Sequence, residues 1–274
     1  MLDNMDNMVN GLTDSLKEVF ESVSRLDCIK GLFLCGGTAQ SIQMNHRLSE
    51  DLDFELIGIR RERPELDFEK VIKELQQVFP GAKVEILGED HFQVFVGDRK
   101  SKLSFYRPDN PVKYIHEGFT YNNIVTPSLQ DLLGMKLYTI CLRTRTRDFY
   151  DIYCLLENGR SLKEGISYAS YLSRHSFKSK DMLGKLLAPK LYPINDEFLK
   201  LQPRKQITSE QMLERFRAAI QEEDKALSNI NKDSPPKDRS HLERYNELEQ
   251  KAFNKALSQK KEDGNEKKSE GYKR

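Results

Sequence analysis

The chain has 274 residues, of which 38% are hydrophobic and 32% charged, and its formal net charge is +1. This balance fits a water-soluble protein with room for two domains, and it excludes a polycation that binds nucleic acid through its overall charge. No run of about 18 apolar residues occurs, and the acidic N-terminus lacks an apolar stretch, so we expect neither a membrane span nor a secretory signal. The four cysteines form no CxxC pair, which fits a reduced cytoplasm.

An apolar run followed by two glycines forms the first motif. Residues 32–35 predict a short buried strand, which Gly36 and Gly37 end. Thr38 is expected to cap a helix over 39–45, whose N-terminal amides would face a bound phosphate. The sequence therefore predicts a phosphate cradle at this turn.

Two aspartates at alternate positions form the second motif. Asp51 and Asp53 lie beside a strand predicted over 52–57, where alternation puts both carboxylates on one face of the sheet. Two carboxylates about 7 Å apart along a strand can share divalent cations. Alone, two glycines indicate a turn and an Asp-x-Asp indicates a solvated strand end. Together, in this order, they indicate phosphoryl or nucleotidyl transfer.

Hydrophobic spacing predicts the other elements. Helices are expected over 8–27 and 66–79, and the strands that follow form a meander over 83–87, 92–96 and 102–106. These elements predict one sheet, opened by a strand, a helix and a second strand.

After a loop over 108–119, the pair Thr126 and Pro127 predicts the start of a helix, with Thr126 as its cap. A second helix is expected to begin at Thr144. The C-terminal half contains further helical patterns, over 166–172, 182–187 and 212–227.

The order of these motifs resembles the polymerase-β nucleotidyltransferase superfamily. The string GGTAQSIQMNHRLSEDLDF, from Gly36 to Phe54, resembles the AbiEii/AbiGii-type toxin nucleotidyltransferases of bacteria. That family also carries an Asp followed by a Lys, and then an Arg-Asp-x-x-Asp. The matching residues here are Asp131, Lys136, Arg147, Asp148 and Asp151. The resemblance covers residues 36–151, more than 40% of the chain.

The resemblance implies an active site that uses Mg²⁺ and an NTP. Asp51 and Asp53 would hold the metal ion and act as catalytic residues. Lys136 would neutralise the triphosphate and the leaving pyrophosphate. The residues expected to contact the nucleotide phosphates beside Lys136 are Gly36, Gly37, Thr38 and Ser49.

The resemblance also implies a general base. Asp148 would accept the proton of the attacking hydroxyl, oriented by Asp151 and Arg147, which complete the expected nucleotide-binding set. Asp148 and Asp151 lie three residues apart, on one face of a helix. The alternative is a salt bridge at a helix end, between Asp148 and Arg145 or Arg147.

One departure from the superfamily pattern concerns a third carboxylate, which a later strand often supplies. Ser104 stands where this carboxylate is expected. Its absence weakens the usual two-metal arrangement, and Glu55 and Glu85 are the candidate substitutes.

These observations predict an α/β (α+β) fold, with a nucleotidyltransferase mixed-sheet core and an all-helical C-terminal domain. The core is expected over 1–127, and the helical domain with the Lys and Arg-Asp-x-x-Asp motifs over 128–228. Residues 229–274 are predicted to form a linker, a charged helix and a disordered tail.

The expected reaction moves an NMP from an NTP to an acceptor, with RNA such as tRNA as the expected class. By resemblance, the protein would be the cytoplasmic toxin of a bacterial toxin–antitoxin or phage-defence pair, with a cognate antitoxin as partner. A nucleotide-binding non-catalytic member and a small-molecule transferase of the aminoglycoside type are the alternatives. Local basic residues that could meet an RNA acceptor are Arg99, Lys100, Lys102, Arg143, Arg145 and Arg147.

Overall fold

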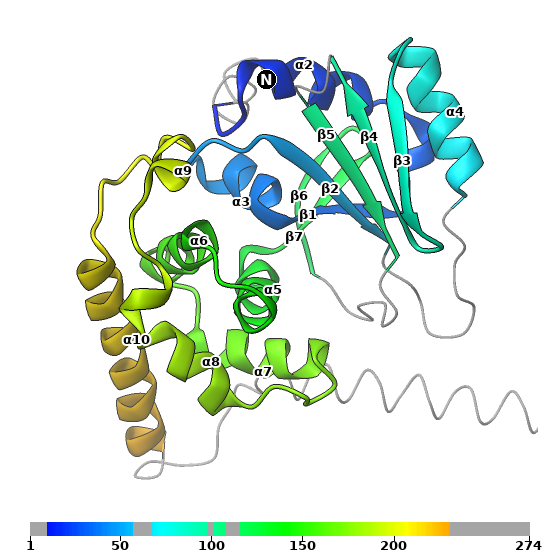
Figure 1. Cartoon of the computed structure of the whole chain (residues 1–274). Helices are drawn as coiled ribbons and strands as arrows, with labels where there is room; N and C mark the ends of the chain where they lie inside the picture. The colour runs from blue at the N-terminus through cyan, green and yellow to red at the C-terminus, as the bar shows by residue number, and fades with distance from the viewer. Residues whose placement is uncertain (1–9, 57–66, 98–100, 108–115, 231–274) are drawn as a thin grey trace, which may run out of the picture. The chain divides into compact units, whose positions relative to one another are not determined.

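The structure is a computed structural model of the whole chain, and it describes residues 10–56, 67–97, 101–107 and 116–230 (Figure 1). The chain divides into two compact units, residues 1–227 and 228–274, and every element below except the end of the last helix belongs to the first. The predictions for Arg99, Lys100, the linker beyond residue 230, the charged helix and the disordered tail lie outside the described residues. No helix in the described part of the chain has the length and apolar character needed to cross a membrane.

Seven strands within the described residues form one mixed sheet with the order β3-β4-β5-β2-β1-β7-β6. β1 pairs with β2 in antiparallel and with β7 in parallel fashion, and β2 pairs with β5 in parallel. The strands are β1 Leu32–Cys35, β2 Asp51–Leu56, β3 Lys83–Gly88, β4 His91–Val96, β5 Ser101–Tyr106, β6 Glu117–Tyr121 and β7 Ile124–Pro127. The predicted mixed sheet is confirmed.

The helices precede, interrupt and follow this sheet in the chain (Figure 1). Short 3₁₀ turns occur at Asp27–Ile29 and Pro189–Leu191. The α-helices are α2 Asp14–Val23, α3 Gly36–Met44, α4 Phe68–Val78, α5 Leu129–Leu142, α6 Thr146–Glu157, α7 Leu162–Leu172, α8 Ser179–Leu186, α9 Asp196–Leu199 and α10 Ser209–Ile230.

Along β2, side chains alternate between the hydrophobic core and the opposite face of the sheet. Leu52 and Phe54 are buried in a core that the sheet forms with α2 and α4. Because successive side chains of a strand point to opposite faces, Asp51, Asp53 and Glu55 lie on the other face. This second face is the one that α3 and α5 approach (Figure 1). The carboxylates of β2 share a pocket lining with residues of these two helices.

A second hydrophobic core lies among the helices of the C-terminal half. Its largest fully buried side chains are Phe149 and Tyr150 of α6, Tyr192, and Phe216 of α10. The predicted α/β class with a helical C-terminal half is therefore confirmed. The boundary between residues 127 and 128 stays a prediction.

The predicted start of α5 is wrong by two residues. Val125, next to Thr126, pairs with β1, so Thr126 and Pro127 belong to β7 instead of a helix. Ser128 caps α5, and its Oγ accepts a hydrogen bond from the Asp131 amide at 3.2 Å. Thr126 and Ser128 are both good helix caps. The sheet pairing decides between them, and local sequence does not reveal it.

Candidate active site

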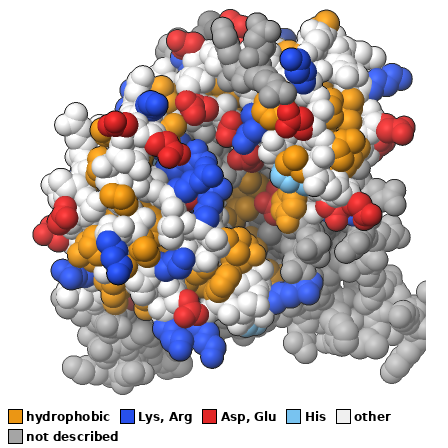
Figure 2. Space-filling model, viewed as in Figure 1, with side chains coloured by type: hydrophobic (Ala, Val, Ile, Leu, Met, Phe, Trp, Pro, Cys, Tyr) orange, Lys and Arg blue, Asp and Glu red, His pale blue; other side chains and the backbone are white. Residues whose placement is uncertain are grey.

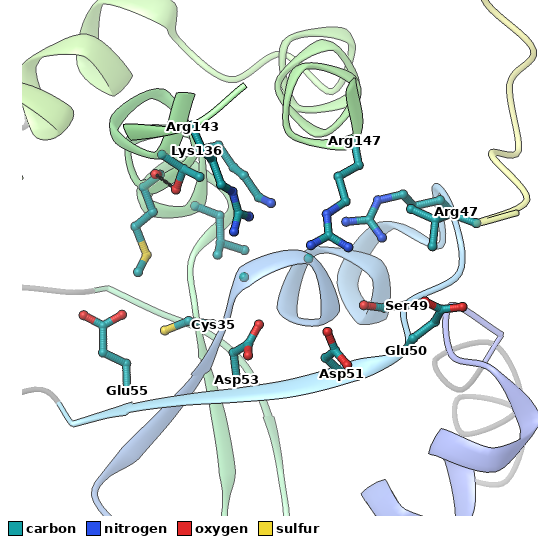
Figure 3. A pocket seen from close by; sticks show the side chains of 16 residues that line it. Cys35, Arg47, Ser49, Glu50, Asp51, Asp53, Glu55, Lys136, Arg143 and Arg147 are labelled. Carbon is teal, nitrogen blue, oxygen red and sulfur yellow. Dashed lines mark hydrogen bonds between the residues drawn. The ribbon is translucent and has the colours of Figure 1, made fainter. Parts of the chain in front are cut away.

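A pocket of about 210 Å³ lies between the second face of β2 and the helices α3 and α5. Figure 3 shows Asp51, Asp53 and Glu55 in a row along the strand, with the side chains of Lys136 and Arg147 on the opposite wall. Figure 2 shows Lys and Arg side chains beside a hollow near the centre of the view. The pocket therefore has one anionic and one cationic wall.

The two glycines of the first motif form the floor of this pocket. Gly36 has a φ of 68°, which favours glycine, and a Cβ there would lie 3.1 Å from Asp53 Oδ2. A Cβ on Gly37 would collide with the guanidinium of Arg47. Glycine is required at these positions because charged side chains approach the backbone closely.

The sequence predicts that Thr38 caps a helix, and this prediction is wrong. α3 already begins at Gly36, with Cys35 at the N-cap position and no side-chain cap. Thr38 Oγ1 lies 2.7 Å from Ser49 Oγ and donates a hydrogen bond to the backbone oxygen of Asp51. Thr38 is thus a buried link between α3 and β2, and it fixes the start of the carboxylate strand.

The carboxylates of β2 differ in environment. Burial raises the pKa of Asp53, although Lys102 on the neighbouring strand opposes this shift. Burial also raises the pKa of Glu55 to about 7, against the lowering effect of its hydrogen bond with Cys35. Lys102 Nζ lies 3.0 Å from Asp51 Oδ2.

The position expected to supply a third carboxylate is occupied by Ser104. In the parallel pairing of β2 with β5, Ser104 lies opposite Asp53, and its Oγ lies 3.0 Å from His91 Nε2. Of the two candidate substitutes, Glu55 lines the pocket and Glu85 lies on β3, outside the pocket lining.

Lys136 projects from α5 and contacts two carboxylates of α6. Its Nζ lies 3.0 Å from Asp148 Oδ1 and 2.6 Å from Asp151 Oδ2. Arg143 Nε donates to Asp148 Oδ2 at 2.9 Å. Burial disfavours a charged Asp148, yet Lys136 and Arg143 hold the pKa of its carboxyl below the usual value. Asp148 is therefore an ionised, paired carboxylate with no exposed surface.

Asp151 accepts from residues that the sequence analysis missed. Arg47 donates to it twice, with Nε 2.7 Å from Oδ1 and Nη2 2.9 Å from Oδ2, and His46 Nε2 lies 2.7 Å from Oδ1. Burial opposes ionisation, but Arg47 and Lys136 hold the pKa of Asp151 well below its usual range. Burial lowers the pKa of His46, so this imidazole is neutral near pH 7.

Arg147 lies apart from these carboxylates. Its guanidinium points into the pocket (Figure 3) and makes no ion pair with another described residue. Among the described residues, the expected contact of Arg147 with Asp148 is therefore not formed, and neither is the alternative, a helix-end salt bridge of Asp148 with Arg145 or Arg147. Instead, Asp148 pairs with Lys136 and Arg143, and Asp151 pairs with Lys136 and Arg47.

The structure brings most of the expected site residues together. Thr38, Asp148 and Asp151 are buried and do not line the pocket, although Asp148 and Asp151 support Lys136, which does. The expected residues that line it are Gly36, Gly37, Ser49, Asp51, Asp53, Lys136 and Arg147. The sequence analysis missed Arg47 and Cys35 in the lining, although Arg47 lies only two residues after the helix predicted over 39–45.

The donors on β2 fit a divalent cation held jointly with substrate. Magnesium is commonly bound through one or two carboxylates together with substrate phosphates, and Asp51 and Asp53 supply two carboxylates. In the described ranges, no group of three or more His, Cys, Asp or Glu side chains could hold a metal ion without substrate. The pair therefore suits a metal ion that arrives with a nucleotide.

A family model named Nucleotidyl transferase AbiEii toxin, type IV TA system, matches residues 20–259. The chain belongs to the AbiEii family. The protein is accordingly a nucleotidyltransferase of the toxin–antitoxin class, with an NTP as substrate and an antitoxin as the partner that this class implies.

Individual relatives are distant. An uncharacterised protein of Aquifex aeolicus is 28% identical over 149 residues, which are 54% of this chain and 69% of the relative. JHP933 from Helicobacter pylori aligns with a TM-score of 0.47 and 16% identity, over 80% of this chain and 98% of that chain. MenT4, a nucleotidyltransferase toxin from Mycobacterium tuberculosis, aligns with a TM-score of 0.40 and 16% identity, over 70% of this chain and 76% of that chain.

Proposed function

We propose that this AbiEii member is a Mg²⁺-dependent enzyme that transfers an NMP from an NTP to RNA, with tRNA as the expected class of acceptor. It acts in the cytoplasm as the toxin of a toxin–antitoxin pair that serves phage defence. One observation carries the proposal. Asp51 and Asp53 face Lys136 and Arg147 across a pocket whose floor is the glycine turn (Figure 3).

In the proposed reaction, an acceptor hydroxyl attacks the α-phosphorus of the NTP. A new phosphorus–oxygen bond forms, the bond to the β-phosphate oxygen breaks, and pyrophosphate leaves. Asp51 and Asp53 would hold the Mg²⁺, which would supply Lewis-acid polarisation of the phosphate oxygens. Arg147 and Lys136 lie on the opposite wall, where their charges stabilise the triphosphate and the leaving group.

The glycine turn and Ser49 are proposed to line the phosphates. Gly36 and Gly37 lie at the pocket floor in the first turn of α3, where the backbone N–H groups have no partner within the helix and can donate to phosphate oxygens. Thr38 supports this contact from behind, by holding Ser49 in place. Asp151 takes part indirectly, because it fixes Lys136 beside the pocket.

The proton of the attacking hydroxyl passes to Asp148, the base proposed from the sequence, or to water in the pocket. The Asp148 carboxylate is ionised, as a base must be, but Lys136 and Arg143 already engage both of its oxygens. Such pairing lowers basicity, so the assignment requires a direct test.

A neighbouring pocket supports an RNA acceptor over a cationic drug. It shares Glu50, Arg147 and Leu201 with the first pocket, so the two cavities adjoin. Its lining adds two cations, Arg145 and Lys200. Together with the shared Arg147 they make three positive charges, against two carboxylates in the same lining. A wall with excess positive charge suits the phosphates of an RNA strand and disfavours an aminoglycoside.

The experiment that tests this function incubates the purified protein and Mg²⁺ with each α-labelled NTP and total cellular RNA. We expect label to enter RNA with one preferred NTP, and Asp51→Asn or Asp53→Asn to abolish incorporation while the protein stays folded. Asp27→Asn is the matched control, because Asp27 also pairs with a lysine but lies on the surface. Full incorporation by either site variant refutes the metal assignment.

A further inference from the structure

The strand beside the carboxylate pair presents a lysine to it. In the parallel register of β2 and β5, Lys102 lies opposite Asp51 and Ser104 opposite Asp53. Residues paired in neighbouring strands project to the same face of the sheet. At the place where an acidic residue would complete a three-carboxylate site, the protein therefore has a cation and a hydroxyl.

The contact of Lys102 with Asp51 is direct. Lys102 Nζ lies 3.0 Å from Asp51 Oδ2, and the two side chains are 29% and 32% exposed. The surface pair of Lys30 with Asp27 is 61% and 68% exposed. The Lys102 pair is thus about half as exposed and, unlike the surface pair, involves a carboxylate that lines the pocket. Partial exclusion of water strengthens the influence of this charge.

The charges of the site favour one divalent ion. Asp51 and Asp53 carry two negative charges, and the ammonium of Lys102 offsets one of them. A second divalent ion would have to bind with no carboxylate on β5 beside Asp51 and Asp53, and against the repulsion of this ammonium. In the described part of the chain, no set of three metal-ligating side chains is available to compensate.

We propose that the ammonium of Lys102 is the second cation of this active site, a fixed charge in the place of a second divalent ion. The inference rests on the proposed function and adds to it the number of metal ions, one per bound nucleotide. Lys102 then compensates part of the negative charge on the reacting phosphate, and Asp51 shares its oxygens between this ammonium and the single Mg²⁺.

The test counts bound metal. Mn²⁺ is titrated into the protein saturated with an α,β-imido NTP, and bound Mn²⁺ is counted by electron paramagnetic resonance. The wild type is expected to bind one Mn²⁺ per complex. Lys102→Asp, which adds the missing carboxylate and removes the cation, is expected to bind two.

Turnover provides the second readout. Lys102→Met is expected to keep one Mn²⁺ but to lose at least about a hundredfold in turnover, the scale of one charged contact to a transition state. Lys102→Arg keeps the charge and is expected to restore most of the turnover. Lys30→Met, the matched surface variant, is expected to match the wild type in both measurements.

The outcomes separate this inference from the proposed function. Two Mn²⁺ ions in the wild type, or normal turnover in Lys102→Met, overturn the role of Lys102 and leave nucleotidyl transfer intact. No bound Mn²⁺ in the wild type overturns both. If Lys102→Met fails to fold, the Mn²⁺ counts of the wild type and the turnover of Lys102→Arg decide, because loss of turnover in Lys102→Arg contradicts the role of a fixed charge.

Discussion

Arg47 and Asp151 form a fully buried bidentate ion pair between residues 104 positions apart in the sequence. Arg47 follows α3 at the floor of the pocket, and Asp151 lies in the second turn of α6. The pair therefore ties the sheet side of the pocket to its helical side. His46 and Lys136 contact the same carboxylate, so Asp151 is the centre of a buried polar cluster.

Asp151→Asn should strongly destabilise the protein, because it leaves Arg47 and Lys136 buried without their shared counter-charge. Removing one partner of a buried ion pair costs about 3–5 kcal/mol. Glu157→Gln, on the same helix, is the control: Glu157 pairs with Lys205 and Arg215 at the surface, where such pairs contribute about 1 kcal/mol or less. Urea denaturation measures both free energies of unfolding, and equal losses would contradict the central role of Asp151.

Acid should weaken the same cluster. The folded protein holds the pKa of Asp151 below its unfolded value of about 3.9, so the folded state binds fewer protons than the unfolded state as pH falls. At neutral pH the ionised Asp151 contributes its full stabilisation. This contribution is lost as pH falls from the pKa of Asp151 in the unfolded chain toward its lower pKa in the folded protein. We expect the free energy of unfolding to fall more steeply below pH 4 in the wild type than in Asp151→Asn. Parallel pH curves would refute this linkage.

Local features of the sequence predicted the motifs well. Gly36, Gly37, Asp51 and Asp53 could be identified because a turn and an alternating strand follow from neighbouring residues. The position of Ser104 opposite Asp53 also matches the predicted departure from the superfamily pattern.

Contacts distant in sequence could not be predicted. The pairing of β7 with β1 moved the helix cap from Thr126 to Ser128, and the ion pair of Arg47 with Asp151 depends on how α6 packs against α3. A single sequence carries no information on which of many arginines meets which aspartate.

Lys136→Met should affect both stability and nucleotide binding. The structure pairs Lys136 with Asp148 and Asp151, so its loss leaves two buried carboxylates with fewer counter-charges. Its loss should also weaken NTP binding by about 1.5–3 kcal/mol, the scale of a charge-assisted hydrogen bond. Calorimetric titration at a temperature where the variant is folded gives the NTP affinity, with Lys30→Met as the control. Unchanged affinity in a destabilised variant would reduce Lys136 to a structural role.

Asp148→Asn tests the general base. A base contributes about 10²–10⁴-fold to the chemical step, and its removal also abolishes the acidic limb of the pH–rate profile. Asp148 is fully buried, and its oxygens accept from Lys136 and Arg143, so we expect a positioning residue: turnover falls less than a hundredfold and the acidic limb stays. Single-turnover kinetics over a range of pH, with NTP affinity measured in parallel, distinguish the two roles. A drop beyond a hundredfold with loss of the acidic limb and unchanged NTP affinity would establish Asp148 as the base.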